Sequence, residues 1–449
     1  MKVLFVSLGC DKNLADAEEM LGMLREAGYS FTDDEQEAEI IIVNTCCFIG
    51  DAKEESIQTI LELAVQKETG KCKVLLVTGC LAERYKEEVL TEMPEVDAII
   101  GTRSYDHLIT ALEKALSGKR SMELCGLERL PERAKKRVLT TGGYYSYLKI
   151  AEGCNKHCTY CVIPSIRGNF TSVPMEDLVA QAEQLAENGV TELILVAQET
   201  TLYGVDIYGK KMLPELLKKL CCIERLKWIR ILYCYPEEIT DELIEVIATE
   251  KKICHYLDIP IQSGSDSVLK RMGRRTNCAQ LSDTISKLRE QVPDIALRTT
   301  LISGFPGETA EDHENTLDFV DAMEFERLGV FTYSPEEGTP AAKMPDQIDE
   351  DIKEARRDEI MELQQEIAFE KAEAMTGRRL TVLIEGKLPE DNVYVGRTYM
   401  DAPGVDGNIF VTCEEELYTG EYVEVTVTGG AEYDLLGECI KEPILEEKL

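Results

Sequence analysis

The chain has 449 residues, of which 44% are hydrophobic, and its 49 Lys and Arg against 84 Asp and Glu give a formal net charge of -35. This length exceeds the size at which one hydrophobic core usually stops growing, so we expect two or three domains. The electrostatic field of so negative a chain repels the nucleic-acid backbone. No apolar run approaches the roughly 18 residues of a membrane span, so we expect no membrane-spanning helix.

We therefore expect a cytoplasmic protein that attracts basic partners. The sequence contains sixteen cysteines. Because the cytoplasm keeps thiols reduced, these cysteines are expected to be metal ligands, redox groups or core residues and not disulfides.

The first hundred residues alternate short β-rich runs with helical patterns. The predicted strands are residues 2–9, 39–45, 73–79 and 97–101. Short parallel strands joined by crossover helices form a doubly wound α/β domain, which we assign to residues 1–117. Residues 118–143 lose the periodicity and collect Lys and Arg, and we interpret them as a solvated linker.

Longer units follow, in which each strand except the last precedes a helix-sized segment. The six predicted strands are residues 145–151, 192–198, 228–234, 255–261, 295–302 and 327–333. A full eightfold barrel typically needs ~250 residues, so residues 144–345 are predicted to form a partial (β/α)6 barrel. Enzymes of this architecture place their chemistry at the C-terminal ends of the strands.

The last part of the chain has a different pattern. Residues 346–375 are predicted to form a long polar helix with an apolar stripe, which connects two domains. Residues 376–441 contain alternating strands with Gly-rich turns, at 379–386, 393–399, 408–412 and 421–430. This pattern is typical of a small five-stranded β-barrel.

Cys154, Cys158 and Cys161 directly follow the first predicted barrel strand. A structural zinc site normally takes four protein ligands, and His157 is the obvious nearby addition. Three thiolates instead suit a 4Fe-4S cluster that is bound at three irons and open at the fourth. We favour the cluster, with zinc or unrelated core cysteines as the alternatives.

A second group of cysteines is dispersed in the sequence. Cys10, Cys46 and Cys80 each lie shortly after a different predicted strand of the N-terminal sheet. The carboxyl ends of parallel strands meet at one edge of an open sheet, so we expect a second metal site there. The alternative is three unrelated buried cysteines. Cys47 is either an alternate ligand or a filler of the core.

Two further barrel loops have the composition of ligand-binding turns. Gly304 and Glu308 lie in LISGFPGE, where the glycines let backbone approach a ligand closely, and Gln198 lies in AQETTLYG at a predicted barrel mouth. Each loop has a simple tight turn as its alternative.

Over essentially its whole length the chain resembles the methylthiotransferase family of radical S-adenosylmethionine (SAM) enzymes, whose signature has the C-x3-C-x2-C spacing. It is similar to the ribosomal branch of that family at the stretches SLGCDKN, YSYLKIAEGCN, IPSIRG, LRTT before GFPGE, RLGVFTYSPEEGTPAA and YVGRTYMDAPGVDG. The resemblance implies a radical SAM barrel followed by a C-terminal TRAM domain.

The resemblance also implies the cofactors and the reaction. Two 4Fe-4S clusters are expected, one on each cysteine trio, with SAM on the open iron of the barrel cluster and Tyr160 beside its adenine. One SAM is the methyl donor and a second is the radical source, and the methylthio group goes to the β-carbon of an aspartate in small ribosomal subunit protein twelve. Gln198, Arg298, Gly304 and Glu308 are expected SAM contacts, with Arg298 meeting its carboxylate.

This chemistry requires two further partners, an electron donor such as flavodoxin or ferredoxin and a sulfur donor. We expect no membrane partner. Two alternative functions are kept. The first is the tRNA adenosine branch of the same family; counting residues 376–439, four Arg or Lys against thirteen Asp or Glu disfavour RNA as the partner of the TRAM region. The second is a non-catalytic metal protein that uses its acidic surface for docking.

Overall fold

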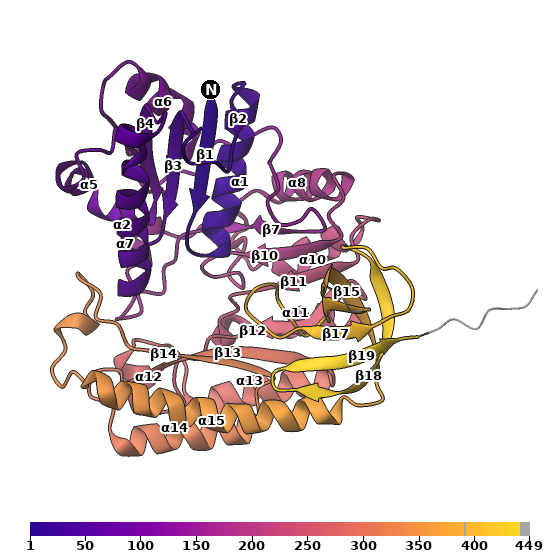
Figure 1. The fold of residues 1–449 in the computed structure, drawn as a ribbon. Coiled ribbons are helices and arrows are strands. Elements are labelled where there is room, and N and C mark those ends of the chain that lie inside the picture. The colour runs from indigo at the N-terminus through magenta and orange to yellow at the C-terminus, as the bar shows by residue number, and fades with distance from the viewer. Residues whose placement is uncertain (390–391, 441–449) are drawn as a thin grey trace, which may run out of the picture.

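The protein is described from a computed structural model that defines residues 1–389 and 392–440. Its N-terminal domain is a six-stranded parallel sheet in the order β2-β1-β3-β4-β5-β6, with helices on both faces (Figure 1). The strands are β1 (Lys2–Ser7), β2 (Ser30–Phe31), β3 (Ile40–Thr45), β4 (Val74–Gly79), β5 (Ala98–Ile100) and β6 (Ser121–Glu123). The helices are α1 (Asp11–Glu26), α2 (Gly50–Ala64), α3 (Gln66–Thr69), α4 (Cys80–Tyr85), α5 (Glu87–Glu92), the short η1 (Tyr105–His107) and α6 (Leu108–Leu116).

The central domain is a six-stranded parallel sheet in the order β14-β13-β12-β11-β10-β7, which agrees with the predicted partial barrel. Its strands are β7 (Tyr145–Lys149), β10 (Glu192–Val196), β11 (Trp228–Ile231), β12 (Ile253–Asp258), β13 (Ala296–Ser303) and β14 (Arg327–Thr332), with a separate pair β8 (Ala151–Glu152) and β9 (Thr171–Ser172). Its helices are α7 (Ile163–Arg167), α8 (Met175–Glu187), α9 (Val205–Tyr208), α10 (Leu213–Cys221), η2 (Pro236–Glu238), α11 (Asp241–Thr249), α12 (Asp266–Arg271), α13 (Cys278–Gln291), α14 (Ala310–Met323) and η3 (Ala341–Lys343). The largest hydrophobic core lies between this sheet and its helices.

The C-terminal part consists of a long helix and a closed barrel. Helix α15 (Glu350–Ala374) contacts α14, β14 and the barrel strand β18, and it runs beside α14 in Figure 1. The barrel has the order β15-β16-β17-β19-β18, from strands β15 (Arg379–Lys387), β16 (Val393–Arg397), β17 (Ile409–Thr412), β18 (Tyr422–Ala431) and β19 (Asp434–Cys439). Strand β19 follows a turn directly after β18 and has no counterpart among the four strands predicted for this part of the chain. The predicted domain end at residue 441 lies outside the described residues.

The linker prediction for residues 118–143 was wrong in two respects. Its beginning contains β6, which pairs with β5 and extends the N-terminal sheet, and three residues are too few to show a strand pattern. Its basic residues are not simply solvated: Arg137 is buried, pairs with Glu18 and donates to the Tyr147 carbonyl. The segment therefore fastens helix α1 to the first barrel strand.

Within residues 1–389 and 392–440, no helix is long and apolar enough to cross a membrane.

Candidate functional site

The three dispersed cysteines of the N-terminal domain meet at one edge of its sheet. Strands β1, β3 and β4 are neighbours, and Thr45 pairs with Gly79 immediately before Cys46 and Cys80. Cys10 precedes α1 at the end of the adjacent strand. Gly9 has a φ of 88°, and a Cβ there would lie 2.7 Å from the Cβ of Cys46, so only glycine lets these two cysteine loops approach each other.

Two of the three thiols at this edge, Cys46 and Cys80, are buried. Among the described residues, no three His, Cys, Asp or Glu side chains are arranged to hold one metal ion. Burial raises the pKa of Cys46, and that of Cys80 to about 11, with Arg167 acting in the opposite direction on both. Any metal centre bound by these thiols would therefore have to displace their protons.

Cys47 lies next to this site but is fully buried within the hydrophobic core between the sheet and helices α2 and α4. Burial raises its pKa to about 12. We assign it to packing.

The clustered cysteines lie in the loop after β8. Cys154 and Cys158 are buried and Cys161 is half-buried. The backbone N–H of Lys156 donates to the Cys154 sulfur over 3.5 Å, and the Cys161 N–H donates to the Cys158 carbonyl. Burial raises the pKa of Cys154 to about 11 and that of Cys161 to about 12. The loop thus places three thiols together, as a cluster with one open iron requires.

One loop of the barrel reaches both cysteine sites. Tyr233, which has a φ of 60°, donates its hydroxyl to the Asp11 carboxylate over 3.0 Å, directly after Cys10. Tyr235, two residues later, brings its hydroxyl within 3.9 Å of the Cys158 sulfur. The segment after β11 therefore bridges the loop of one trio to the loop of the other.

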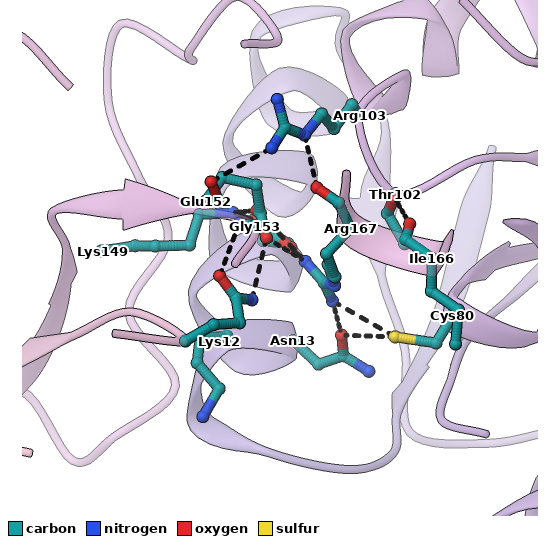
Figure 2. A network of polar contacts seen from close by, with 12 residues as sticks. Lys12, Asn13, Cys80, Thr102, Arg103, Lys149, Glu152, Gly153, Ile166 and Arg167 are labelled. Atoms are coloured by element: carbon teal, nitrogen blue, oxygen red, sulfur yellow. Dashed lines mark hydrogen bonds and ion pairs between the residues drawn. The ribbon is translucent and has the colours of Figure 1, made fainter. Parts of the chain in front are cut away.

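A buried polar network joins the same two sites on another side (Figure 2). Arg167, at the end of α7, pairs with Asp16 at 2.8 Å and with Glu152 at 3.2 Å. Its second amino group donates to Asn13 and, over 3.5 Å, to the Cys80 sulfur. This one guanidinium therefore connects Cys80 of the N-terminal domain to the segment that leads into the barrel trio.

We expect Arg167→Met to lower the stability of the metal-free protein by about 3–5 kcal/mol, because it leaves Asp16 and Glu152 buried with fewer countercharges. Chemical unfolding followed by intrinsic fluorescence measures the shift in midpoint. Lys73→Met, which removes an exposed ion pair, is the matched control and should leave the midpoint unchanged. An equal midpoint for all three proteins would show that the network contributes nothing.

Two of the expected SAM contacts lie beside the clustered cysteines. Tyr160 packs edge-to-face on Phe305, with ring centroids 6.3 Å apart. Gln198 accepts a hydrogen bond from the Gly153 N–H at 2.7 Å and donates to Glu152 at 2.9 Å. Tyr160 is thus placed to flank a ligand, whereas the Gln198 amide is engaged in holding the start of the cysteine loop.

Gly304 and Glu308 have protein partners on helix α15. A Cβ on Gly304 would lie 2.1 Å from the Cγ of Lys353, so the glycine makes room for that side chain. Glu308 accepts from the Gly304 N–H at 3.2 Å and pairs with Arg356 at 2.8 Å. The structure therefore explains both residues by packing against α15, and direct SAM contact is not needed to account for them.

Arg298 lies in a cavity of about 370 Å³ that Cys10, Asp11, Tyr233, Asp258 and Val405 also line. This cavity is formed by the N-terminal domain, the central sheet and the C-terminal barrel. The guanidinium pairs with Asp258 at 3.0 Å and with Asp406 at 3.3 Å. The structure thus places Arg298 in the same cavity as Cys10, and its contact with SAM stays a prediction.

Glu199 lies in the same predicted barrel-mouth loop as Gln198 but was not among the expected SAM contacts. Its carboxylate is fully buried, and burial raises its pKa to about 7 against the opposing effect of Lys156. One oxygen accepts from the Thr201 hydroxyl, whereas the other has no hydrogen-bond partner in the described structure and lies 3.6 Å from the Lys156 ammonium. A carboxylate oxygen that accepts no hydrogen bond, although the Lys156 ammonium lies nearby, has room to receive a cationic ligand.

Three family descriptions match successive parts of the chain. Residues 2–101 match "Uncharacterized protein family UPF0004", residues 148–320 match the Radical SAM superfamily, and residues 376–440 match the TRAM domain.

Two named relatives are similar over nearly the whole chain. Ribosomal protein uS12 methylthiotransferase RimO of Lachnoclostridium phytofermentans is 65% identical, over 97% of this chain and 99% of the relative. The protein of the same name from Pelotomaculum thermopropionicum is 50% identical, over 98% and 99%.

Solved structures are similar in fold at low sequence identity. The radical S-adenosylmethionine methyltransferase TsrM of Kitasatospora setae, with cobalamin and a [4Fe-4S] cluster bound, has a TM-score of 0.55 at 14% identity. The match covers 88% of this chain and 77% of that one. The cobalamin-dependent enzyme OxsB has a TM-score of 0.52 at 15% identity, over 82% of this chain and 56% of that one.

Proposed function

The chain belongs to the ribosomal protein uS12 methylthiotransferases of the radical SAM superfamily, and we propose that it inserts a methylthio group at the β-carbon of an aspartate of uS12. One observation carries this proposal: a single chain holds two separate sites of three thiols, and one loop, Tyr233 to Tyr235, contacts both. Sulfur insertion into a C–H bond needs a radical source and a sulfur carrier close together, and two such sites provide for both.

The radical SAM superfamily implies a 4Fe-4S cluster and SAM, and Cys154, Cys158 and Cys161 are the ligands that we assign to that cluster. We assign a second 4Fe-4S cluster to Cys10, Cys46 and Cys80. When bound, the first cluster would supply the electron that cleaves SAM to a 5′-deoxyadenosyl radical, and the second would carry the sulfur to be inserted.

The protein's own groups bind and orient the reactants. Glu199, with its unpartnered oxygen, is proposed to receive the α-ammonium group of SAM, and Tyr160 to flank the adenine. Tyr235 and the Lys156 backbone hold the loop that carries the three thiols. These contacts fix the distance between the reacting atoms, which is where enzymes of this kind gain rate.

The overall change replaces one C–H bond of the aspartate with a C–S bond. One SAM takes the hydrogen atom and leaves as methionine and 5′-deoxyadenosine, while a second SAM gives its methyl group to the sulfur and leaves as S-adenosylhomocysteine. A reductant of the flavodoxin or ferredoxin class and a sulfur donor are proposed partners. We place the enzyme in the cytoplasm, where its sixteen free cysteines stay reduced.

The charge of the TRAM barrel supports a basic protein as substrate over tRNA. Of the four Arg or Lys in residues 376–439, Arg397 is buried and pairs with Glu192 at 2.6 Å and with Glu385 at 2.8 Å. It is therefore not available to bind phosphate. An RNA-binding barrel needs a basic groove with stacking aromatics, whereas an acidic one complements a basic ribosomal protein.

The test is to incubate the anaerobically reconstituted enzyme with SAM, sulfide and reductant, and to offer unmodified uS12 and tRNA in separate reactions. We expect mass spectrometry to find one methylthio group on an aspartate of uS12 and none on tRNA. Modification of a tRNA adenosine, with tight tRNA binding that weakens steeply with salt, would assign the chain to the tRNA reaction instead.

A further inference from the structure

The cavity that Cys10 lines has one positively charged side chain among its lining residues in the described structure. Among its lining residues in the described structure, Arg298 on β13 is the only Lys or Arg, and it lies with the anions Asp11 and Asp258. One oxygen of Asp11 has partners, because Lys12 pairs with it at 3.1 Å and the Tyr233 hydroxyl donates to it, whereas the other oxygen is buried and has no hydrogen-bond partner in the described structure. Arg298 is therefore the group in this cavity that can attract an anion.

The guanidinium of Arg298 is oriented but not saturated. Its Nη1 pairs with Asp258 at 3.0 Å and its Nε with Asp406 at 3.3 Å. Its Nη2 has no hydrogen-bond acceptor among the described residues. It is also absent from the fully buried atoms that lack a partner, so it is accessible to a ligand. Two nitrogens of the guanidinium are thus held by protein carboxylates and the third is accessible, which is the arrangement expected of a group that receives a ligand.

Resting on the proposed function, we propose that Arg298 receives the side-chain carboxylate of the target aspartate and so positions its β-carbon. The β-carbon of aspartate is bonded directly to the carboxylate carbon, so a carboxylate held here places the reacting carbon in the cavity beside Cys10. Because Nη1 and Nε are already held by Asp258 and Asp406, Nη2 is the donor left for one oxygen of the incoming carboxylate, in a charge-assisted hydrogen bond.

The two carboxylates that hold Arg298, those of Asp258 and Asp406, also accept hydrogen bonds from other donors. Asp258 also accepts from the Tyr233 backbone N–H at 3.1 Å. Asp406 accepts from the Tyr256 hydroxyl at 2.7 Å and from the Ala402 N–H at 2.8 Å. Burial raises the pKa of Asp406, with Arg298 acting in the opposite direction.

Selectivity for aspartate follows from this geometry. An asparagine side chain is uncharged and presents an NH₂ group to a guanidinium that can only donate. A charge-assisted pair is therefore lost, and we expect the wild-type enzyme to bind the aspartate peptide roughly 10- to 100-fold more tightly than the asparagine peptide.

The experiment measures binding of two synthetic uS12 peptides, one with the target aspartate and one with asparagine in its place, to the reconstituted enzyme by fluorescence anisotropy. We expect Arg298→Met to abolish the preference for aspartate. Arg298→Lys, which keeps the charge but loses the fork, should retain part of it. SAM binding is measured for every protein by equilibrium dialysis.

Arg327→Met is the matched control. Arg327 pairs in register with Arg298 across β13 and β14 and also binds a TRAM carboxylate, Asp401, at 3.0 Å, but it does not line this cavity. The Arg327→Met variant should keep the preference for the aspartate peptide, although it also loses an ion pair between the central sheet and the TRAM barrel. If both variants lose the preference equally, Arg298 only holds the TRAM barrel in place and the inference is wrong.

Two further outcomes would also overturn the inference. One is an aspartate preference that survives in Arg298→Met. The other is weakened SAM binding in that variant with an intact preference, which would return Arg298 to the SAM carboxylate. A wild-type enzyme that binds neither peptide and modifies no uS12 would instead refute the proposed function, so the two failures are told apart by the wild type.

Discussion

Replacing Cys154 by alanine is expected to abolish formation of 5′-deoxyadenosine from SAM and to lower the iron content of the reconstituted enzyme from about eight to about four per chain. Cys154 follows β8 and is one of three thiols held in a single loop. A cluster left with two protein ligands there is not retained, and without it nothing can deliver an electron to the sulfonium. The remaining four irons belong to the separate site at Cys10, Cys46 and Cys80.

Cys254→Ala controls for the loss of a buried thiol from the same domain. Cys254 is buried on β12 and is assigned no ligand role, so about eight irons and normal SAM cleavage are expected. The prediction is contradicted if Cys154→Ala keeps its full iron content, or if the wild type contains zinc in place of iron. Iron and sulfide analysis measures the cluster content, and high-performance liquid chromatography measures the 5′-deoxyadenosine formed.

Replacing Cys46 is expected to separate the two halves of the reaction. Cys46→Ala should lose about four irons and all methylthiolated product, yet it should still cleave SAM to 5′-deoxyadenosine. The physical reason is that the barrel site is complete without the N-terminal one, whereas the sulfur-carrying site loses a ligand. Mass spectrometry of the uS12 peptide and quantification of the nucleoside in the same reaction test this.

The adjacent residue provides a close control. Cys47 is fully buried in the core of the N-terminal domain, so Cys47→Ala removes one buried sulfur and should cost stability through packing alone. Its iron content and product yield should match those of the wild type. The opposite pattern, with iron lost from Cys47→Ala and kept in Cys46→Ala, would make Cys47 the ligand.

The positions of the cysteines could be predicted from the sequence, whereas their role as cluster ligands stays a prediction. The barrel trio is contiguous in the sequence, and the dispersed trio follows from the rule that ends of parallel strands share one edge of the sheet. The strand pairing of Thr45 with Gly79 then places Cys46 and Cys80 side by side, as expected.

The contacts between domains could not be predicted, because they join residues far apart in the chain. Gly304 was expected to approach a ligand, but the side chain of Lys353 from α15 occupies that space. Arg137 was expected in a solvated linker, but the carboxylate of Glu18 on α1 holds it. Arg298 was expected at SAM, although its distance from Cys10 depends on how three domains assemble around one cavity. Neither the hydrophobic periodicity nor a motif of a single sequence predicts how side chains of different domains pack against each other.

The most direct test of the whole account is a reaction with a uS12 peptide whose target aspartate carries deuterium at the β-carbon. The account predicts that deuterium appears in 5′-deoxyadenosine and that the same aspartate carries the methylthio group, because the radical and the sulfur act on one carbon in one cavity. Methylthiolated peptide formed alongside 5′-deoxyadenosine without deuterium would contradict it, since the hydrogen would then have come from another position.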